Sequence, residues 1–278
     1  MPNILDRILA VKRREVADLR PRLESLKAAA RDAELPRGFA RALRRPKEGV
    51  RSLKGVGLLT PSSDAGAPIR IIAEIKHRSP SAGILIDPFV PAAIARQYEQ
   101  GGADAISCLT DRDFFGGSIA HLAEVHAATR LPVLRKDFII EEVQIYEARA
   151  AGADAILLIA EALEPAAMTD LAALAASLGM DVLAEAHSEP MAGRAIACGA
   201  ALVGINNRDL ATFKVDLATT ERLAPRVLAA GRILVAESGV KTAADVKRLL
   251  AAGADAILVG EGLLRSGDVG ARLAEFKM

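Results

Sequence analysis

The chain of 278 residues has few aromatic side chains, few cysteines and almost no net charge. It contains no tryptophan, two tyrosines and two cysteines, Cys108 and Cys198. Two cysteines so far apart form neither a disulfide framework nor a metal site of recognisable spacing, so we expect reduced, packed thiols. A net charge of +1 creates no overall field that would attract nucleic acid or an anionic membrane, and neither is an expected partner.

Long apolar runs are also absent. The longest, at residues 153–159, is far shorter than the ~20 residues that span a bilayer. The first residues lack the apolar core of a secretory signal. We therefore expect a cytoplasmic protein, and an apolar fraction of 51% is enough for one large core.

Helical patterns precede the main part of the chain. Residues 3–20 have an apolar side with Leu5 and Ile8 and an opposite side with Lys12, which predicts an amphipathic helix that Pro21 ends or kinks. A shorter helix is expected near residues 39–43. Residues 46–68 are rich in glycine, serine and proline, as in a connector. We therefore expect a helical extension and connector at 1–68 and a main domain at 69–278.

The main domain repeats a short motif. Gly-Ala-Asp-Ala-Ile starts at Gly102, Gly152 and Gly253, and a looser form starts at Gly199, at intervals of roughly 50 residues, the length of two βα units. Each glycine is expected to close the preceding helix in a left-handed conformation. The pattern predicts strands at residues 70–76, 104–109, 132–135, 154–159, 181–186, 202–206, 233–236 and 255–259.

Eight strands alternating with helices predict an α/β fold, the (β/α)8 or TIM barrel, with the N-terminal helical extension over its C-terminal rim. An open, doubly wound sheet is the alternative. That fold would favour Gly-x-Gly-x-x-Gly after an early strand, and no such motif follows the first strand.

Charged side chains gather where the predicted strands end, which is where barrel enzymes carry their active sites. We expect the converging lysines and glutamates to perturb one another's pKa values towards neutrality, as general acid–base catalysis requires. A buried ion network that only fills the barrel mouth is the alternative. The candidate catalytic residues are Glu74, Lys76, Lys136, Glu185, Asn206 and Glu237.

The last two strands are followed by glycine-containing loops, Ser238-Gly239 and Gly260-Glu261-Gly262. Loops at these two places commonly bind phosphate through backbone N–H groups, although either alone could be a simple turn. Phe114, Phe115 and Phe138 follow predicted strands two and three, and they form either core packing or a wall for a planar ring. The histidines have no companions at metal-ligand spacing and are expected to be structural or solvent-facing: His77, His121, His126 and His187.

Six motifs occur in order along the chain: Ile72-Ala73-Glu74-Ile75-Lys76 with Ser79-Pro80-Ser81, Leu109-Thr110 with Phe114-Phe115-Gly116-Gly117-Ser118, Leu134-Arg135-Lys136-Asp137-Phe138-Ile139, Glu185-Ala186-His187, Gly204-Ile205-Asn206-Asn207-Arg208-Asp209-Leu210 and Ala236-Glu237-Ser238-Gly239. Together they resemble indole-3-glycerol-phosphate synthase of tryptophan biosynthesis, over nearly the whole chain from residue 3. The resemblance implies the ring closure of 1-(2-carboxyphenylamino)-1-deoxyribulose 5-phosphate to indole-3-glycerol phosphate, with loss of CO2 and water. It implies no metal or organic cofactor.

The resemblance also implies roles. Lys136 would be the general acid, Lys76 would contact the anthranilate carboxylate, and Glu185 would be an acid–base partner. Glu74, Asn206 and Glu237 would hold the lysines and the substrate hydroxyls. The implied substrate-binding residues are Phe115 and Phe138 at the ring, Arg208 at the border of the site, and Ser79, Ser238, Gly239, Gly260 and Glu261 at the phosphate.

The chain departs from the family pattern in two places. Glu261 stands where the family often has a small hydroxyl residue, and a carboxylate cannot donate to phosphate, so only its N–H group would help. The connector is also longer than the family norm. We expect a monomer or weak homo-oligomer that binds a small phosphorylated substrate.

Two other functions are compatible with a barrel of this kind. A phosphoribosylanthranilate isomerase would require a cysteine near the end of the first strand and an aspartate, whereas this chain has Glu74 and Lys76 there. A non-catalytic phosphosugar-binding barrel would keep the two glycine loops, but it would not require two lysines and three glutamates to converge.

Overall fold

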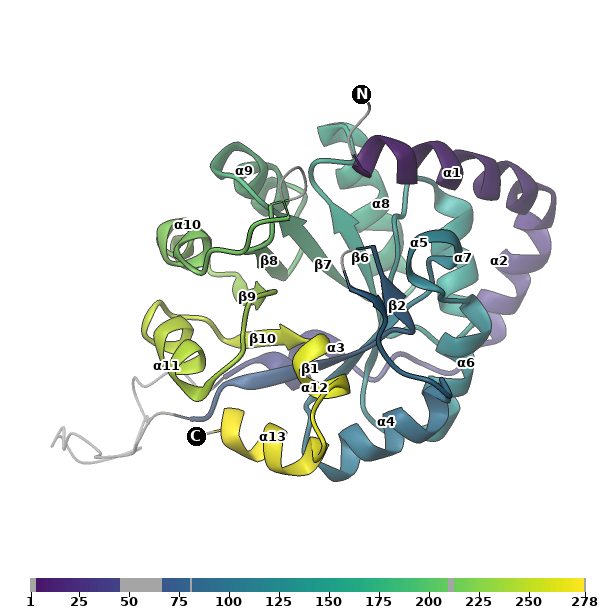
Figure 1. Cartoon of the computed structure of the whole chain (residues 1–278). Coiled ribbons are helices and arrows are strands. Elements are labelled where there is room, and N and C mark those ends of the chain that lie inside the picture. The colour runs from purple at the N-terminus through teal and green to yellow at the C-terminus, as the bar shows by residue number, and fades with distance from the viewer. Residues whose placement is uncertain (1–3, 46–66, 81, 210–212, 278) are drawn as a thin grey trace, which may run out of the picture.

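The structure is a computed structural model that describes residues 4–45, 67–80, 82–209 and 213–277. Its centre is a closed barrel of eight parallel strands in the order β1-β10-β9-β8-β7-β6-β5-β4, which confirms the predicted (β/α)8 fold (Figure 1). The strands are β1 Arg70–Ile75, β4 Ala105–Leu109, β5 Val133–Lys136, β6 Ala155–Ile159, β7 Asp181–Ala186, β8 Leu202–Asn206, β9 Ile233–Glu237 and β10 Ala256–Val259. A small hairpin after β1, formed by β2 Arg78–Ser79 and β3 Gly83–Ile84, was not predicted.

Helices surround the barrel because the strands are apolar on both faces. Alternate residues such as Ile72 and Leu134 fill the barrel interior, and their neighbours such as Ile71 and Val133 pack against the helices. The outer helices are α4 Pro91–Gln100, α6 Ile119–Ala128, α7 Glu142–Ala150, α8 Pro165–Ser177, α9 Glu189–Ala197, α10 Ala218–Ala229, α11 Ala243–Ala251 and α13 Val269–Phe276. Two short helices lie at the rim, α5 Arg112–Phe115 and α12 Glu261–Leu264. No helix among the described residues is long and apolar enough to cross a membrane.

The N-terminal segment covers both ends of the barrel. Helix α1 Ile4–Leu19 lies across the rim where the strands end (Figure 1). After a 3-10 turn at Arg20–Arg22 the chain continues as α2 Leu23–Asp32, which was not predicted and packs with α1 against α7. Helix α3 Phe39–Leu43 closes the opposite end, where Phe39 and Leu43 are fully buried in the barrel interior. The division into 1–68 and 69–278 stays a prediction, and the connector at 46–68 lies outside the described residues up to residue 66.

The repeated motif builds the floor of the barrel, the end opposite the rim. Its glycines have φ angles of +86° at Gly102, +88° at Gly152 and Gly199, and +93° at Gly253, which confirms the predicted left-handed conformation. The aspartate of each full repeat accepts a hydrogen bond from the first residues of a neighbouring strand. The pairs are Asp104 with Ile71 N–H at 2.8 Å, Asp154 with Val133 N–H at 2.7 Å and Asp255 with Leu234 N–H at 3.0 Å.

The prediction that Lys12 lies on the polar, solvent side of its helix was wrong. Lys12 is 2% exposed, and its ammonium lies 2.7 Å from Asp137, 3.3 Å from Asp111 and 2.6 Å from Glu15. The helix presents this side to the barrel because the carboxylates of Asp111 and Asp137, which follow β4 and β5, are buried and require a cation. Helix α1 is therefore fixed by charge next to Lys136, the neighbour of Asp137 in the chain.

Candidate active site

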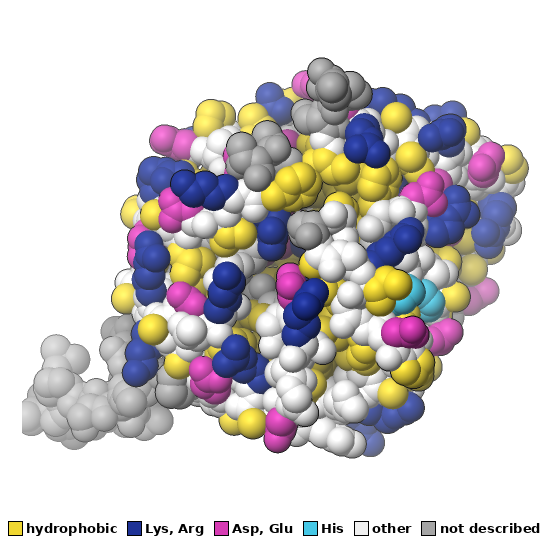
Figure 2. Space-filling view, viewed as in Figure 1, with side chains coloured by type: hydrophobic (Ala, Val, Ile, Leu, Met, Phe, Trp, Pro, Cys, Tyr) yellow, Lys and Arg dark blue, Asp and Glu magenta, His cyan; other side chains and the backbone are white. Residues whose placement is uncertain are grey.

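The carboxyl ends of the strands surround a cavity of about 920 Å³. Figure 2 shows this face hollowed in the middle, with lysine, arginine, aspartate and glutamate side chains around the hollow. Apolar residues of α1, among them Ile4 and Ile8, complete the wall. Every predicted site residue lines this cavity: Glu74, Lys76, Ser79, Phe115, Lys136, Phe138, Glu185, Asn206, Arg208, Glu237, Ser238, Gly239, Gly260 and Glu261.

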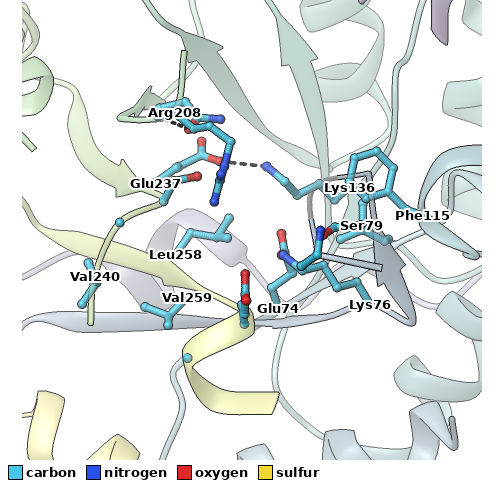
Figure 3. Close-up of a pocket in the computed structure, with 18 of the residues that line it drawn as sticks. Glu74, Lys76, Ser79, Phe115, Lys136, Arg208, Glu237, Val240, Leu258 and Val259 are labelled. Atoms are coloured by element: carbon cyan, nitrogen blue, oxygen red, sulfur yellow. Dashed lines mark hydrogen bonds and ion pairs between the residues drawn. The ribbon is translucent and has the colours of Figure 1, made fainter. Parts of the chain in front are cut away.

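Lys136 lies at the centre of the charged cluster. Its ammonium is 3.0 Å from Oε2 of Glu185 on β7 and 2.8 Å from Oε2 of Glu237 on β9. In Figure 3 the lysine and Glu237 point toward each other across the cavity. Burial disfavours the charged form of Lys136, but the carboxylates of Glu185, Glu237 and Glu74 outweigh burial and raise its pKa above the ordinary value. Lys136 is therefore charged at neutral pH. Its pKa and that of Glu185 move away from neutrality, contrary to the expectation, because opposite charges stabilise each other's ionised form.

The pKa values of the two carboxylates beside Lys136 are shifted in opposite directions. Burial raises the pKa of Glu185, but Lys136 and His187 outweigh burial and hold the pKa well below its usual range. Burial, followed by the charge of Glu185, raises the pKa of Glu237 to about 8. Adjacent carboxylates whose pKa values separate in this way are the usual arrangement of an acid–base pair, with one member ionised and the other protonated.

A glycine that sequence reasoning missed makes room for this pair. A Cβ atom on Gly204 of β8 would lie 2.1 Å from Oε1 of Glu237, so no larger residue fits there with the glutamate in place. Oε1 of Glu237 is buried and has no hydrogen-bond partner among the described residues. A glycine inside a strand is the sequence feature that could have indicated this close approach.

A second acid–base pair lies at the end of β1, as its sequence predicted. Lys76 and Glu74 form a direct ion pair, with side chains that are 16% and 6% exposed. Gly260 faces the pair, and a Cβ atom there would lie 2.5 Å from Oε1 of Glu74 and 3.1 Å from Nζ of Lys76. The loop after β10 can thus approach the β1 pair closely because that position is a glycine.

Polar and aromatic groups complete the cavity wall. Asn206 donates from Nδ2 to Oε1 of Glu185 at 3.1 Å, and its Oδ1 accepts from the Arg208 N–H at 3.0 Å. Arg208 extends its guanidinium over the cavity (Figure 3). Phe115 and Phe138 lie together with ring centroids 6.3 Å apart, so both expected ring contacts form one apolar surface.

The two expected phosphate loops lie side by side because β9 and β10 are adjacent. Ser238 and Gly239 both have left-handed φ angles, +63° and +93°, and a Cβ atom on Gly239 would lie 2.5 Å from Val215. The carboxylate of Glu261 pairs with Arg265 at 3.2 Å, so its charge has a cationic partner. Arg265, Arg272 and Lys241 also line the cavity, and no sequence motif indicated these cations.

The histidines differ in their surroundings. His77 stacks on Phe89 at 5.1 Å, and His121 contacts the same ring edge-on, in agreement with structural roles. His187 is not solvent-facing, because its ring lies between the carboxylates of Glu161 and Glu185 and its side chain is 10% exposed. Within the described part of the chain, no three histidine, cysteine or acidic side chains are placed to hold a metal ion.

The fold and the cavity define a class of protein, the (β/α)8-barrel enzymes that work by acid–base chemistry at the carboxyl ends of the strands. The family model of indole-3-glycerol phosphate synthase matches residues 5–276. The chain belongs to the indole-3-glycerol phosphate synthase family, the lyases of tryptophan biosynthesis.

Named relatives cover the chain almost completely. The indole-3-glycerol phosphate synthase of Albidiferax ferrireducens is 48% identical over 99% of this chain and 98% of its own length. That of Chloroherpeton thalassium is 46% identical, covering 94% of this chain and 95% of the relative. Among solved structures, a 3-hexulose-6-phosphate synthase has a TM-score of 0.59 at 17% identity, over 75% of this chain and 98% of that chain. A thiamine phosphate pyrophosphorylase from Pyrococcus furiosus has a TM-score of 0.57 at 18% identity, over 75% and 93%. These structures support the fold alone.

Proposed function

We propose that the chain converts 1-(2-carboxyphenylamino)-1-deoxyribulose 5-phosphate into indole-3-glycerol phosphate, CO2 and water. The observation that carries the proposal is the ammonium of Lys136, held between Glu185 and Glu237 on the wall of the cavity. A charged donor between an ionised and a protonated carboxylate supplies the acid–base groups that ring closure and dehydration require.

Lys136 acts as the general acid of ring closure. The attacking ring carbon and the carbonyl belong to one molecule, so the site accelerates the reaction by folding the substrate into a near-attack geometry. As the bond forms, Lys136 protonates the carbonyl oxygen and its charge stabilises the developing alkoxide. Lys76 orients the carboxylate that leaves as CO2, and Glu185 serves as the acid–base partner in dehydration. Glu74, Asn206 and Glu237 hold these groups.

The remaining residues bind the two ends of the substrate. Phe115 and Phe138 pack against the anthranilate ring, since they form the apolar part of the wall. Arg208 borders the site and contributes charge. The phosphate is bound by Ser79, Ser238, Gly239, Gly260 and Glu261, the last three through backbone N–H groups. The pairing of Glu261 with Arg265 supports this assignment, because it offsets the repulsion that a carboxylate would exert on phosphate.

The test is product formation by the purified protein. Incubated with the substrate and no added metal, the wild-type chain should produce indole fluorescence. Lys136→Met should abolish turnover but leave product affinity within about tenfold, since it removes an interaction made mainly in the transition state. Lys247→Met, an exposed lysine of α11, is the matched control and should keep full activity. Full activity of Lys136→Met would refute the proposed mechanism.

The same assay separates the two other functions. An isomerase would consume phosphoribosylanthranilate instead, and a binding barrel would bind phosphosugars without turnover. We further propose that the protein works in the cytoplasm on this small phosphorylated substrate, as a monomer or weak homo-oligomer. Sedimentation at assay concentrations tests the oligomeric state.

A further inference from the structure

His187 lies on the side of Glu185 away from the substrate cavity. Its Nε2 is 3.5 Å from Oε1 of Glu185, and its Nδ1 is 3.3 Å from Oε2 of Glu161. Neither His187 nor Glu161 is among the residues that line the cavity. The backbone N–H of His187 also donates to Oε1 of Glu161 at 2.9 Å, which fixes this carboxylate beside the ring.

The imidazole ring of His187 lies near two carboxylates but makes no side-chain hydrogen bond with the described residues. Both nitrogens of His187 are buried without a hydrogen-bond partner among the described residues, although the two carboxylates are within ion-pair distance. A movement of a few tenths of an ångström would bring either carboxylate to hydrogen-bonding distance. The ring therefore faces two carboxylates without being held in a fixed hydrogen bond by either of them.

The three side chains also form a gradient of exposure. The side chain of Glu185 is 4% exposed, that of His187 is 10% exposed and that of Glu161 is 20% exposed. The spatial path from Glu185 through His187 to Glu161 therefore leads from the bottom of the charged cluster towards solvent. The ionisable groups that act on the ring are Glu161, Glu185 and Glu237. Burial lowers the pKa of His187, but these carboxylates outweigh burial and raise it.

The proposed reaction requires a supply of protons. The carbonyl oxygen of the substrate leaves as water and so takes up two protons, whereas formation of the aromatic five-membered ring returns one. The loss of CO2 from an ionised carboxylate releases no proton. Each turnover therefore consumes one proton from solvent, and this proton has to reach a cluster of buried groups around Lys136.

We propose that His187 and Glu161 act through Glu185 as the route by which this consumed proton is resupplied. The protonated imidazole gives its Nε2 proton to Oε1 of Glu185. The neutral ring then rotates so that the nitrogen that lost its proton faces Glu161, and it takes a proton there that Glu161, the most exposed of the three side chains, accepts from solvent. The Glu161 carboxylate then stabilises the imidazolium that forms. Glu185 passes the proton to the donor side of the cluster, since its other oxygen contacts Lys136. The proposal rests on the proposed function.

Two variants of His187 test the route. Glutamine keeps the approximate size and polarity of the ring but cannot take up and release a proton near neutral pH, so His187→Gln should lower kcat at least about tenfold, with KM within about threefold. Its first turnover should keep the wild-type rate, because the resting cluster already holds protons. His187→Ala should recover kcat when imidazole is added. The matched control is His121→Gln on α6, which should behave like wild type.

The pH profile supplies a readout that packing alone would not change. Wild-type kcat should fall as pH rises through the raised pKa of His187, and this limb should be missing in His187→Gln. Wild-type kcat and pH profile in His187→Gln would overturn the proposal. A slow His187→Ala that imidazole does not rescue would overturn it too, because that result indicates packing. Failure of the proposed function is distinguishable, since no variant or wild-type protein would then form product.

Discussion

Substitution of Lys12 by methionine tests how α1 is held on the barrel. Methionine keeps most of the apolar stem but removes the ammonium that contacts Asp137 at 2.7 Å and Asp111 at 3.3 Å. Arg135 still pairs with Asp137 at 3.0 Å, so Asp137 keeps one cation. Asp111 has no other ion pair among the described residues, and it is fully buried. The variant therefore leaves a buried carboxylate without a cation.

Removing one partner of a buried ion pair typically costs about 3–5 kcal/mol, because the remaining charge has lost its solvation without compensation. This is a large part of the ~5–15 kcal/mol that stabilises a folded protein. In urea unfolding followed by circular dichroism, the midpoint of Lys12→Met should fall by about 1 M or more. Burial already raises the pKa of Asp111, and Lys12 opposes this effect. Without Lys12 that pKa rises further, so the defect of the variant should shrink as acidic pH protonates Asp111.

Lys27→Met is the matched control. Lys27 lies on α2 and pairs with Glu24 at 3.0 Å. The two residues are three positions apart in a helix, as Lys12 and Glu15 are, but the Lys27 pair is open to solvent. Exposed pairs are largely screened, so the unfolding midpoint of Lys27→Met should stay close to that of wild type. A Lys12→Met midpoint shift no larger than that of Lys27→Met, at neutral pH, would refute the reasoning that α1 is fixed by a buried charge.

Two further predictions concern the rim. The pKa of Glu237 is raised from 4.5 to about 8 in the folded protein. Between these two values the folded state keeps a proton that the unfolded state has lost, so the folded state becomes less favoured as pH rises. The free energy of unfolding should therefore fall by a few kcal/mol between pH 5 and pH 8.5. Glu237→Gln should flatten that dependence in urea titrations, and an equally steep dependence would contradict the assignment. Gly260→Ala should lower kcat/KM by about 10²-fold, because the new Cβ displaces Glu74 by roughly 1 Å. Gly267→Ala, where a Cβ would meet nothing within 4 Å, should leave steady-state kinetics unchanged. Equal kinetics of the two alanine variants would count against the close approach at Gly260.

The barrel could be predicted from sequence because the periodic features of this chain are local. The repeat starting at Gly102 fixed the spacing of the units, and each strand is short, apolar and followed by a helical pattern. Helix α2 was missed because a proline such as Pro21 is normally taken to end a helix when only the sequence is considered. In the structure, Pro21 lies in the first turn of a 3-10 segment, where its missing N–H costs nothing, and the chain then continues as α2.

The rim residues were predictable for a similar reason. A charged residue at the end of an apolar strand, such as Lys136 or Glu185, is easy to recognise in the sequence because the residues before it are apolar. The features that were missed depend on pairs far apart in the chain. Lys12 appears solvent-facing until Asp137 is brought beside it, and Gly204 appears ordinary until Glu237 occupies the space of its absent side chain. Such information lies in the packing and not in any one segment.

The hydrogen bonds at the floor of the barrel have a consequence for how such a protein can change. Asp104, Asp154 and Asp255 hold neighbouring strands through backbone N–H groups, which every residue except proline provides. These hydrogen bonds align the strands at the floor of the barrel. They do not depend on which side chains the strands carry at the rim. Substitutions at the rim can therefore change the chemistry of the site without changing how the strands are aligned. The rim can evolve new activities for this reason, and the floor is the place where substitutions that raise the stability of the fold should be sought.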